Sequence, residues 1–148
     1  MNANLVANAK TSITATRREV WQALVTPADI KHYMFGAEVE SDWQRGSEIT
    51  WKGEANGKAY EDNGVILRFE HYRTLQYSHF SPLSGKPDLP ENYHTVSIYL
   101  AVNGNQTEVS LFQDNNPDEK SRRQSEKNWG TMLAGLKKYV ELPSRQAA

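Results

Sequence analysis

The chain has 148 residues, and its 17 Lys and Arg against 18 Asp and Glu give a formal net charge of -1 at pH 7. This length predicts one domain with a hydrophobic core, spanning residues 1–148 with its core at about 10–142. The balanced charge excludes the concentrated positive surface that nucleic-acid binding requires.

The sequence has no cysteine, which excludes disulfides, thiolate zinc sites and cysteine nucleophiles. The four histidines lack HExxH spacing, so neither a metal nor a cofactor is expected. Residues 1–20 lack the continuous apolar core of a secretory signal, and no window approaches the ~20 apolar residues that span a bilayer. We therefore expect a cytoplasmic protein without a membrane span.

The first elements are a strand and two short helices. Alternating residues predict a strand over 5–15. Thr16 and Glu19 form a capping box at the start of a helix. Thr26 and Pro27 begin a second, shorter helix, because proline at a first helical position loses no hydrogen bond. The expected buried stripe of the first helix is Val20, Trp21 and Leu24.

The middle of the chain reads as strands and turns. Asn-Gly at 103–104 predicts a tight hairpin, since both residues readily adopt positive φ. Segment 81–92 contains three of the six prolines and is expected to be a surface loop. The predicted strands are 37–40, 47–52, 58–70, 74–80, 95–102 and 107–113.

A long amphipathic helix is predicted over 118–142. At roughly 25 residues it spans about 37 Å, the width of a small domain. It is the element long enough to cover one face of an antiparallel sheet. We therefore predict an α+β fold of about six to seven strands curved around this helix, the helix-grip arrangement. The helical stripe is Trp129, Met132, Leu133, Leu136 and Val140.

Two segments, EVWQALVTPADIKHYMF and QDNNPDEKSRRQSEKNWGTMLAGLKKYVE, resemble the AHSA-type family (activator of heat-shock protein 90 ATPase homologue) of the START-like, or SRPBCC, superfamily. The similarity covers about residues 10–142. It implies a helix-grip fold with a cavity between the long helix and the concave sheet face. Such cavities in the superfamily bind lipids, hormones and polyketides, and sometimes host cyclisation or hydrolysis. The resemblance carries over no catalytic residue.

Candidate polar groups for this cavity are two histidines. Alternation places His79 on one strand face with Tyr77, and His94 on one face with Val96. Both histidines lie at strand ends beside segment 81–92, and we predict that they stand at the cavity mouth. There either one could hydrogen-bond a ligand or act as a general base, and the plain alternative is a half-exposed histidine at a strand end.

The predicted cavity walls are aromatic and apolar side chains, for which ordinary core packing is the alternative. The acidic pairs Glu38/Glu40 and Glu61/Asp62 are expected to be solvated charges. The full predicted ligand-binding set is Tyr33, Phe35, Trp43, Trp51, Tyr77, His79, His94, Met132, Leu133 and Leu136.

The predicted function is binding of a small hydrophobic or amphipathic molecule in the internal cavity, without a requirement for catalysis. Two alternatives stay open. One is a cyclase- or hydrolase-like enzyme with His79 or His94 as base and Tyr77 as hydrogen-bond donor. The other is a protein-interaction module of the chaperone-cofactor type, with a protein partner or a homodimer.

Overall fold

The computed structural model describes residues 5–142, in which seven strands form one antiparallel sheet in the order β1-β7-β6-β5-β4-β3-β2. The strands are β1 (Leu5–Ile13), β2 (Glu38–Ser41), β3 (Glu48–Ala55), β4 (Lys58–Glu70), β5 (Thr74–His79), β6 (His94–Asn103) and β7 (Gln106–Asn116). The helices are α1 (Arg17–Val25), α2 (Pro27–Ile30) and α3 (Glu119–Val140).

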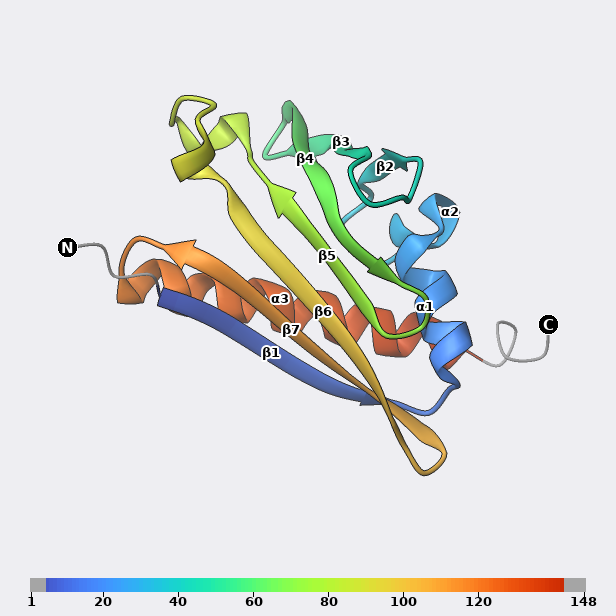
Figure 1. Ribbon diagram of the computed structural model, residues 1–148. Helices are drawn as coiled ribbons and strands as arrows, with labels where there is room; N and C mark the ends of the chain where they lie inside the picture. The colour runs from blue at the N-terminus through green and yellow to red at the C-terminus, as the bar shows by residue number, and fades with distance from the viewer. Residues whose placement is uncertain (1–4, 143–148) are drawn as a thin grey trace.

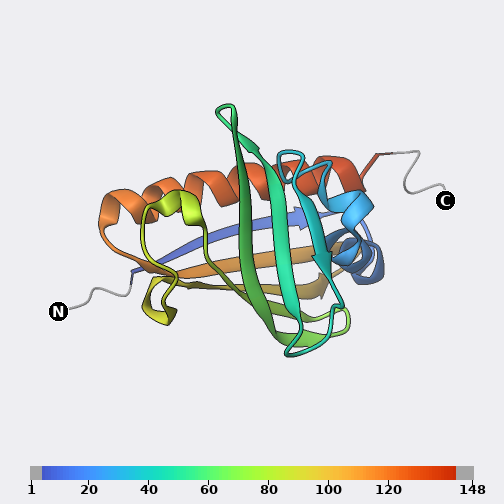
Figure 2. The same ribbon diagram turned by 90° about the horizontal axis from the view of Figure 1, so that it is seen from above.

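The sheet curves around α3, which lies against its concave face (Figure 1). Figure 2 shows β3 and β4 running steeply across the direction of β1 and β7, so the sheet wraps the helix. The predicted α+β helix-grip fold is confirmed. None of the helices within the described residues is long and apolar enough to cross a membrane.

The helix starts follow from local sequence chemistry. Thr16 Oγ1 accepts a hydrogen bond from Glu19 N at 3.1 Å, and Glu19 Oε1 accepts one from Thr16 N at 3.1 Å, which completes the predicted capping box. At the start of α3, Asp118 Oδ1 accepts from Ser121 N at 2.8 Å. Pro27 stands at the first position of α2, as predicted.

The turns also follow from the sequence. Asn103 pairs with Gln106 across a two-residue turn in which Gly104 has φ of 64°, so the β6–β7 hairpin is confirmed. Segment 81–92 runs over the surface between β5 and β6. It contains two short 3-10 turns, Pro82–Ser84 and Pro90–Asn92, each beginning at a proline whose fixed φ suits that position.

The core lies between α3 and the concave face of the sheet. The four C-terminal residues of the predicted stripe are buried, and Leu136 is 0% exposed. Inward side chains of alternate sheet positions meet them, among them Ile98, Val109 and Leu111. The first nine residues after the α3 start differ, because Lys120 through Asn128 includes no large apolar side chain. The helix therefore fills the concave face over only part of its length.

Leu136→Ala is expected to lower the free energy of unfolding by ~2 to 5 kcal/mol, because it removes a fully buried side chain and leaves a void. Chemical denaturation measures this loss. Lys138→Ala, on the exposed side of the same helical turn, should change stability by less than ~0.5 kcal/mol. Equal effects of the two substitutions would show that the stripe does not carry the core.

Candidate functional site

The described residues enclose two hollows on the concave side of the sheet. The first has a volume of about 20 Å³, room for about one water molecule, and lies between the short helices and strands β2, β3, β5 and β6, with Met132 of α3 on one side. The second has a volume of about 200 Å³ and lies where β5 ends and β6 begins. We call the second the mouth cavity; it is lined by Met34, Phe35, Ala37, Trp51, Tyr60, Asp62, Tyr77, His79, His94, Gln113 and Trp129.

The mouth cavity lies where α3 runs out of apolar side chains. Trp129 is the first large apolar residue of this helix, and it closes one side of the cavity. Before it the helix presents polar residues, which cannot fill the concave face as the later stripe does. The sequence carried this signal in the polar run that precedes Trp129.

The predicted site residues divide among three places. Those that line the mouth cavity are Phe35, Trp51, Tyr77, His79 and His94. Those that line the small central hollow are Tyr33, Trp43 and Met132, together with Trp51 and Tyr77. The remaining two, Leu133 and Leu136, are buried in the core and line neither hollow.

Asp62 corrects one prediction. The sequence predicts a solvated charge at this position, as at its neighbour Glu61. Glu61 is exposed, but Asp62 turns inward, where it lines the mouth cavity and pairs across the strands with Trp51. Alternation gave the signal, because Asp62 shares its strand face with the buried Ile66. Tyr60, Gln113 and Trp129 were likewise missing from the predicted set.

Asp62 forms a close pair with His79. Asp62 Oδ2 lies 2.9 Å from His79 Nε2. A carboxylate only accepts, so Nε2 carries the proton and Nδ1 is the nitrogen left for other partners. The Trp51 ring meets the imidazole edge to face, with centroids 4.9 Å apart. A carboxylate that orients an imidazole is the arrangement that general bases use.

Close approach of β4 to β5 permits this pair. Gly64 lies opposite His79 in the sheet, and a β-carbon on Gly64 would stand 1.7 Å from the carbonyl oxygen of Ser78. Any other residue would force the strands apart. The glycine therefore keeps Asp62, two residues earlier, within reach of the histidine.

One oxygen of the pair is unsatisfied. Asp62 Oδ1 is buried and has no hydrogen-bond partner among the described residues. A buried polar atom without a partner costs free energy, about 1 to 3 kcal/mol and more for a charged group. Such an atom beside a cavity is a feature that a bound molecule or a side-chain rotation would relieve.

His94 presents a second imidazole to the cavity. Its Nδ1 lies 2.9 Å from the carbonyl oxygen of Asp114 and 3.1 Å from Gln113 Nε2. The carbonyl can only accept and is the closer of the two, so Nδ1 carries the proton and Nε2 holds the lone pair. Burial lowers the pKa of His94, and neighbouring His79 lowers it further, against an opposing contribution from the Asp114 carbonyl. The ring is therefore neutral at pH 7.

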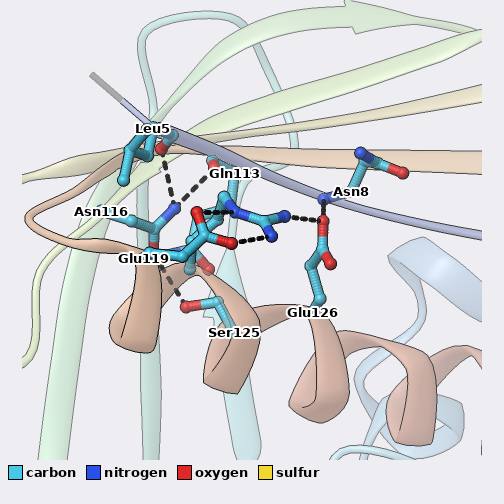
Figure 3. A network of polar contacts seen from close by, with 8 residues as sticks. Leu5, Asn8, Gln113, Asn116, Glu119, Ser125 and Glu126 are labelled. Atoms are coloured by element: carbon cyan, nitrogen blue, oxygen red, sulfur yellow. Dashed lines mark hydrogen bonds and ion pairs between the residues drawn. The ribbon is translucent and has the colours of Figure 1, made fainter. Parts of the chain in front are cut away.

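A polar network fixes this end of the cavity (Figure 3). Asn116 is 2% exposed, and its Nδ2 donates to the carbonyls of Leu5 at 3.0 Å and Gln113 at 3.1 Å. Its Oδ1 accepts from Ser125 Oγ at 2.9 Å. Gln113 Oε1 in turn accepts from the indole N–H of Trp129. One buried asparagine thus joins β1, β7 and α3 behind the cavity wall.

Two aromatic residues at the rim are unusual, one in its backbone conformation and the other in its close contact with a glycine. Phe35 is 70% exposed and has φ of 56°, a left-handed conformation that bulky residues seldom adopt. Tyr60 lies across Gly53 of β3, where a β-carbon would stand 2.8 Å from the tyrosine oxygen. Burial raises the pKa of Tyr60, and Asp62 adds to the rise, so its hydroxyl stays protonated at neutral pH.

Charge in the cavity wall is sparse. Among the described residues that line it, Asp62 is the one carboxylate, and neither Lys nor Arg is present. Within residues 5–142 no three His, Asp or Glu side chains are grouped so that they could hold a metal ion. The wall offers aromatic faces, two imidazoles, an amide and two tyrosine hydroxyls.

The family described as "Activator of Hsp90 ATPase homolog 1-like protein" has a sequence model that matches residues 14–141. The chain belongs to this family. A search of curated proteins gives no match. The family assignment agrees with the resemblance seen in the two terminal segments and with the helix-grip fold.

Solved structures show the same fold. ChR145 from Cytophaga hutchinsonii is 57% identical over the whole of both chains, with a TM-score of 0.84. The Aha1 dimer from Colwellia psychrerythraea is 21% identical, with a TM-score of 0.74 over 93% of this chain and 97% of that one. CalU16 from Micromonospora echinospora is 20% identical, with a TM-score of 0.71 over 99% and 90% of the two chains.

Asn116→Ala is expected to reduce the free energy of unfolding by about 1 to 3 kcal/mol, because it leaves buried carbonyl groups without their donor. Thermal or chemical denaturation measures this. Asn128→Ala is the matched control, since Asn128 is exposed on α3 and alanine favours the helix. A loss in the control as large as that in Asn116→Ala would contradict the role assigned to the network.

Proposed function

We propose that this protein binds a small amphipathic molecule in the mouth cavity. The observation that carries the proposal is a hollow of about 200 Å³ whose wall combines aromatic side chains with a few convergent polar groups. Ligand sites generally have this composition. A dry cavity of about 150 Å³ holds benzene, so the mouth cavity suits a molecule of about one substituted ring.

The position of the cavity refines the expectation from the sequence. The middle of the helix, at Leu133 and Leu136, is packed core, so the proposed ligand lies toward the N-terminal half of α3. Trp51 and Tyr77 separate the two hollows and would contact it from the sheet side. Leu133 and Leu136 would then belong to the packed core and would not contact the ligand.

The position of Phe35 at the exposed rim of the cavity also supports ligand binding. An exposed aromatic ring held in a left-handed backbone contributes little to the core and carries conformational strain. Such a residue at the rim of a hollow is placed to cover a bound molecule. Its neighbour Gly36 has φ of 80°, which lets the chain reverse directly behind the ring.

The family assignment is compatible with a ligand-binding module and with a chaperone-cofactor module. We favour ligand binding because the mouth cavity combines volume with convergent polar groups. The setting that we propose is the cytoplasm, with which a chain free of cysteine is compatible.

Ala37→Leu tests the proposal, because Ala37 is buried in the cavity wall and a larger side chain would occupy the hollow. Protein purified from its own host should carry a small molecule, detected by native mass spectrometry, that Ala37→Leu lacks. Stability should hold or rise by ~0.5 to 2 kcal/mol, as for other cavity-filling changes.

Leu133→Trp provides the contrast, since Leu133 lies in packed core. The extra volume there should cost ~1 to 3 kcal/mol of unfolding free energy. An Ala37→Leu protein that loses stability as Leu133→Trp does, and that keeps the same co-purifying molecule, would contradict binding in the mouth cavity.

The Asp62–His79 hydrogen bond favours a second candidate, acid–base catalysis on the bound molecule. His79 Nδ1 would take a proton while Asp62 holds the imidazole in place, and the Tyr77 hydroxyl would donate to a developing negative oxygen. Both groups line the cavity, so this candidate uses the same site.

If the protein is an enzyme, it should deplete a compound when it is incubated with a small-molecule extract of its host. Mass spectrometry of the extract before and after incubation measures this depletion. His79→Phe should abolish that depletion, because general-base catalysis typically contributes 10²- to 10⁴-fold. Val102→Thr is the control, as Val102 is exposed at the other end of β6. No depletion by the unmodified protein would leave binding as the function.

A further inference from the structure

We propose that the mouth cavity selects a neutral aromatic molecule carrying a hydrogen-bond donor, such as a phenolic hydroxyl, over an apolar molecule or a carboxylate of the same shape. The inference rests on the proposed function, which it deepens by naming the ligand class. It follows from which polar atoms in the cavity wall already have partners and which do not.

The first free acceptor is His94 Nε2. The Asp114 carbonyl, 2.9 Å from Nδ1, fixes the proton on that nitrogen. The neutral ring then presents a lone pair at Nε2, for which no partner exists among residues 5–142. A ligand hydroxyl or N–H is the group that completes this hydrogen bond.

The second free acceptor is His79 Nδ1. Asp62 Oδ2, 2.9 Å away, accepts from Nε2, so Nδ1 is the ring nitrogen left to accept a hydrogen bond from a ligand. The rings of His79 and His94 are stacked with centroids 6.4 Å apart, so the two acceptors belong to one small region. Asp62 Oδ1, buried and without a partner among the described residues, is a third acceptor beside them.

The same wall also holds donors. The Tyr60 and Tyr77 hydroxyls keep their protons at neutral pH and can donate as well as accept, so a ligand hydroxyl, which does both, suits this wall. The Trp129 indole N–H donates to Gln113 Oε1. Gln113 Nε2 donates to Asn116 Oδ1 at 3.5 Å and cannot also donate to His94 Nδ1, which carries its own proton. With Asp62 as the one charge and no Lys or Arg in the described wall, a ligand carboxylate would find repulsion and no counter-ion.

The aromatic side chains of the cavity wall favour a ligand of planar shape. Trp51 contacts both Tyr77 and His79, with centroids 5.1 and 4.9 Å away. Phe35 and Trp129 line the cavity from the rim and the helix. Flat aromatic walls favour a planar ligand through stacked and edge-to-face contacts.

Protonation of His94 would reverse its role, because Nε2 then becomes a donor. The ionisable groups around it are His79 on β5, Asp114 on β7, Lys86 in segment 81–92 and, beyond His79, Asp62 on β4. Burial keeps the ring neutral at pH 7. The preference for a donor ligand should therefore hold at neutral pH and decline only at a more acidic pH, because burial lowers the pKa of His94 from its ordinary value.

The test compares three probes of matched shape: 4-methylphenol, p-xylene and 4-methylbenzoate. Binding to the full chain is followed by NMR through the indole N–H resonances of the tryptophans, two of which line the cavity. At about pH 7.5, 4-methylphenol should bind about threefold to tenfold more tightly than p-xylene, the range expected for one net hydrogen bond. The benzoate should bind most weakly.

His94→Phe keeps a ring and removes one of the acceptors, so it should reduce the preference for 4-methylphenol over p-xylene without weakening p-xylene. If this variant does not fold, the same comparison on unmodified protein replaces it, with the pH lowered from about 7.5 until the His94 imidazole resonances report protonation, where the preference should decline. A preference unchanged in the folded variant, or unchanged at the lower pH when the variant does not fold, would refute the role of His94.

The remaining outcomes separate the two proposals. Binding of p-xylene equal to or tighter than that of 4-methylphenol, or tightest binding by the benzoate, overturns the donor preference and leaves the cavity as a ligand site. Absence of indole shifts with all three probes up to their solubility limits overturns the proposed function and this inference together.

Discussion

The contact between the apolar stripe of α3 and the concave face of the sheet determines the rest of this structure. A sheet with one buried face needs a cover, and α3 is the long helix available. The stripe begins at Trp129 and continues through Val140, so the cover is apolar over about half of the helix. Where the stripe is present, the interior is solid, and the hollow there has a volume of only about 20 Å³.

The mouth cavity follows from the other half of the helix. Its side chains are polar from Glu119 to Asn128 and cannot fill an apolar concavity. A network centred on Asn116 holds this half against β1 and β7 in place of hydrophobic packing. The sheet therefore keeps polar and aromatic residues pointing into a space that the helix does not occupy. The change from polar to apolar side chains at Trp129 of α3 thus marks the boundary between the mouth cavity and the packed core.

Several residues around that space have unusual local geometry or bonding. Phe35 is an exposed aromatic residue at positive φ, and Asp62 has a buried oxygen without a partner. Gly64 places two strands closer than any side chain would allow. Sequences usually agree with their fold at every level, and local departures concentrate where a protein performs its function. Phe35 and Asp62 both line the mouth cavity, which supports the choice of that cavity as the site; positive φ also occurs away from it, at Trp43, Asn56, Tyr72 and Asn115.

The element order, the capping box at Thr16, the Asn-Gly hairpin and the α3 stripe could be predicted from the sequence, because each depends on neighbours in the chain or on a single periodicity. The terminal segments indicated the family, and alternation placed His79 and His94 on inward faces. The position of the hollow emerged only from the folded structure. So did the contact of Asp62 with His79, which requires the paired strands β4 and β5 to lie unusually close at Gly64. The position of a cavity depends on how the side chains of several elements, distant in the sequence, pack together, and no local sequence pattern contains that information.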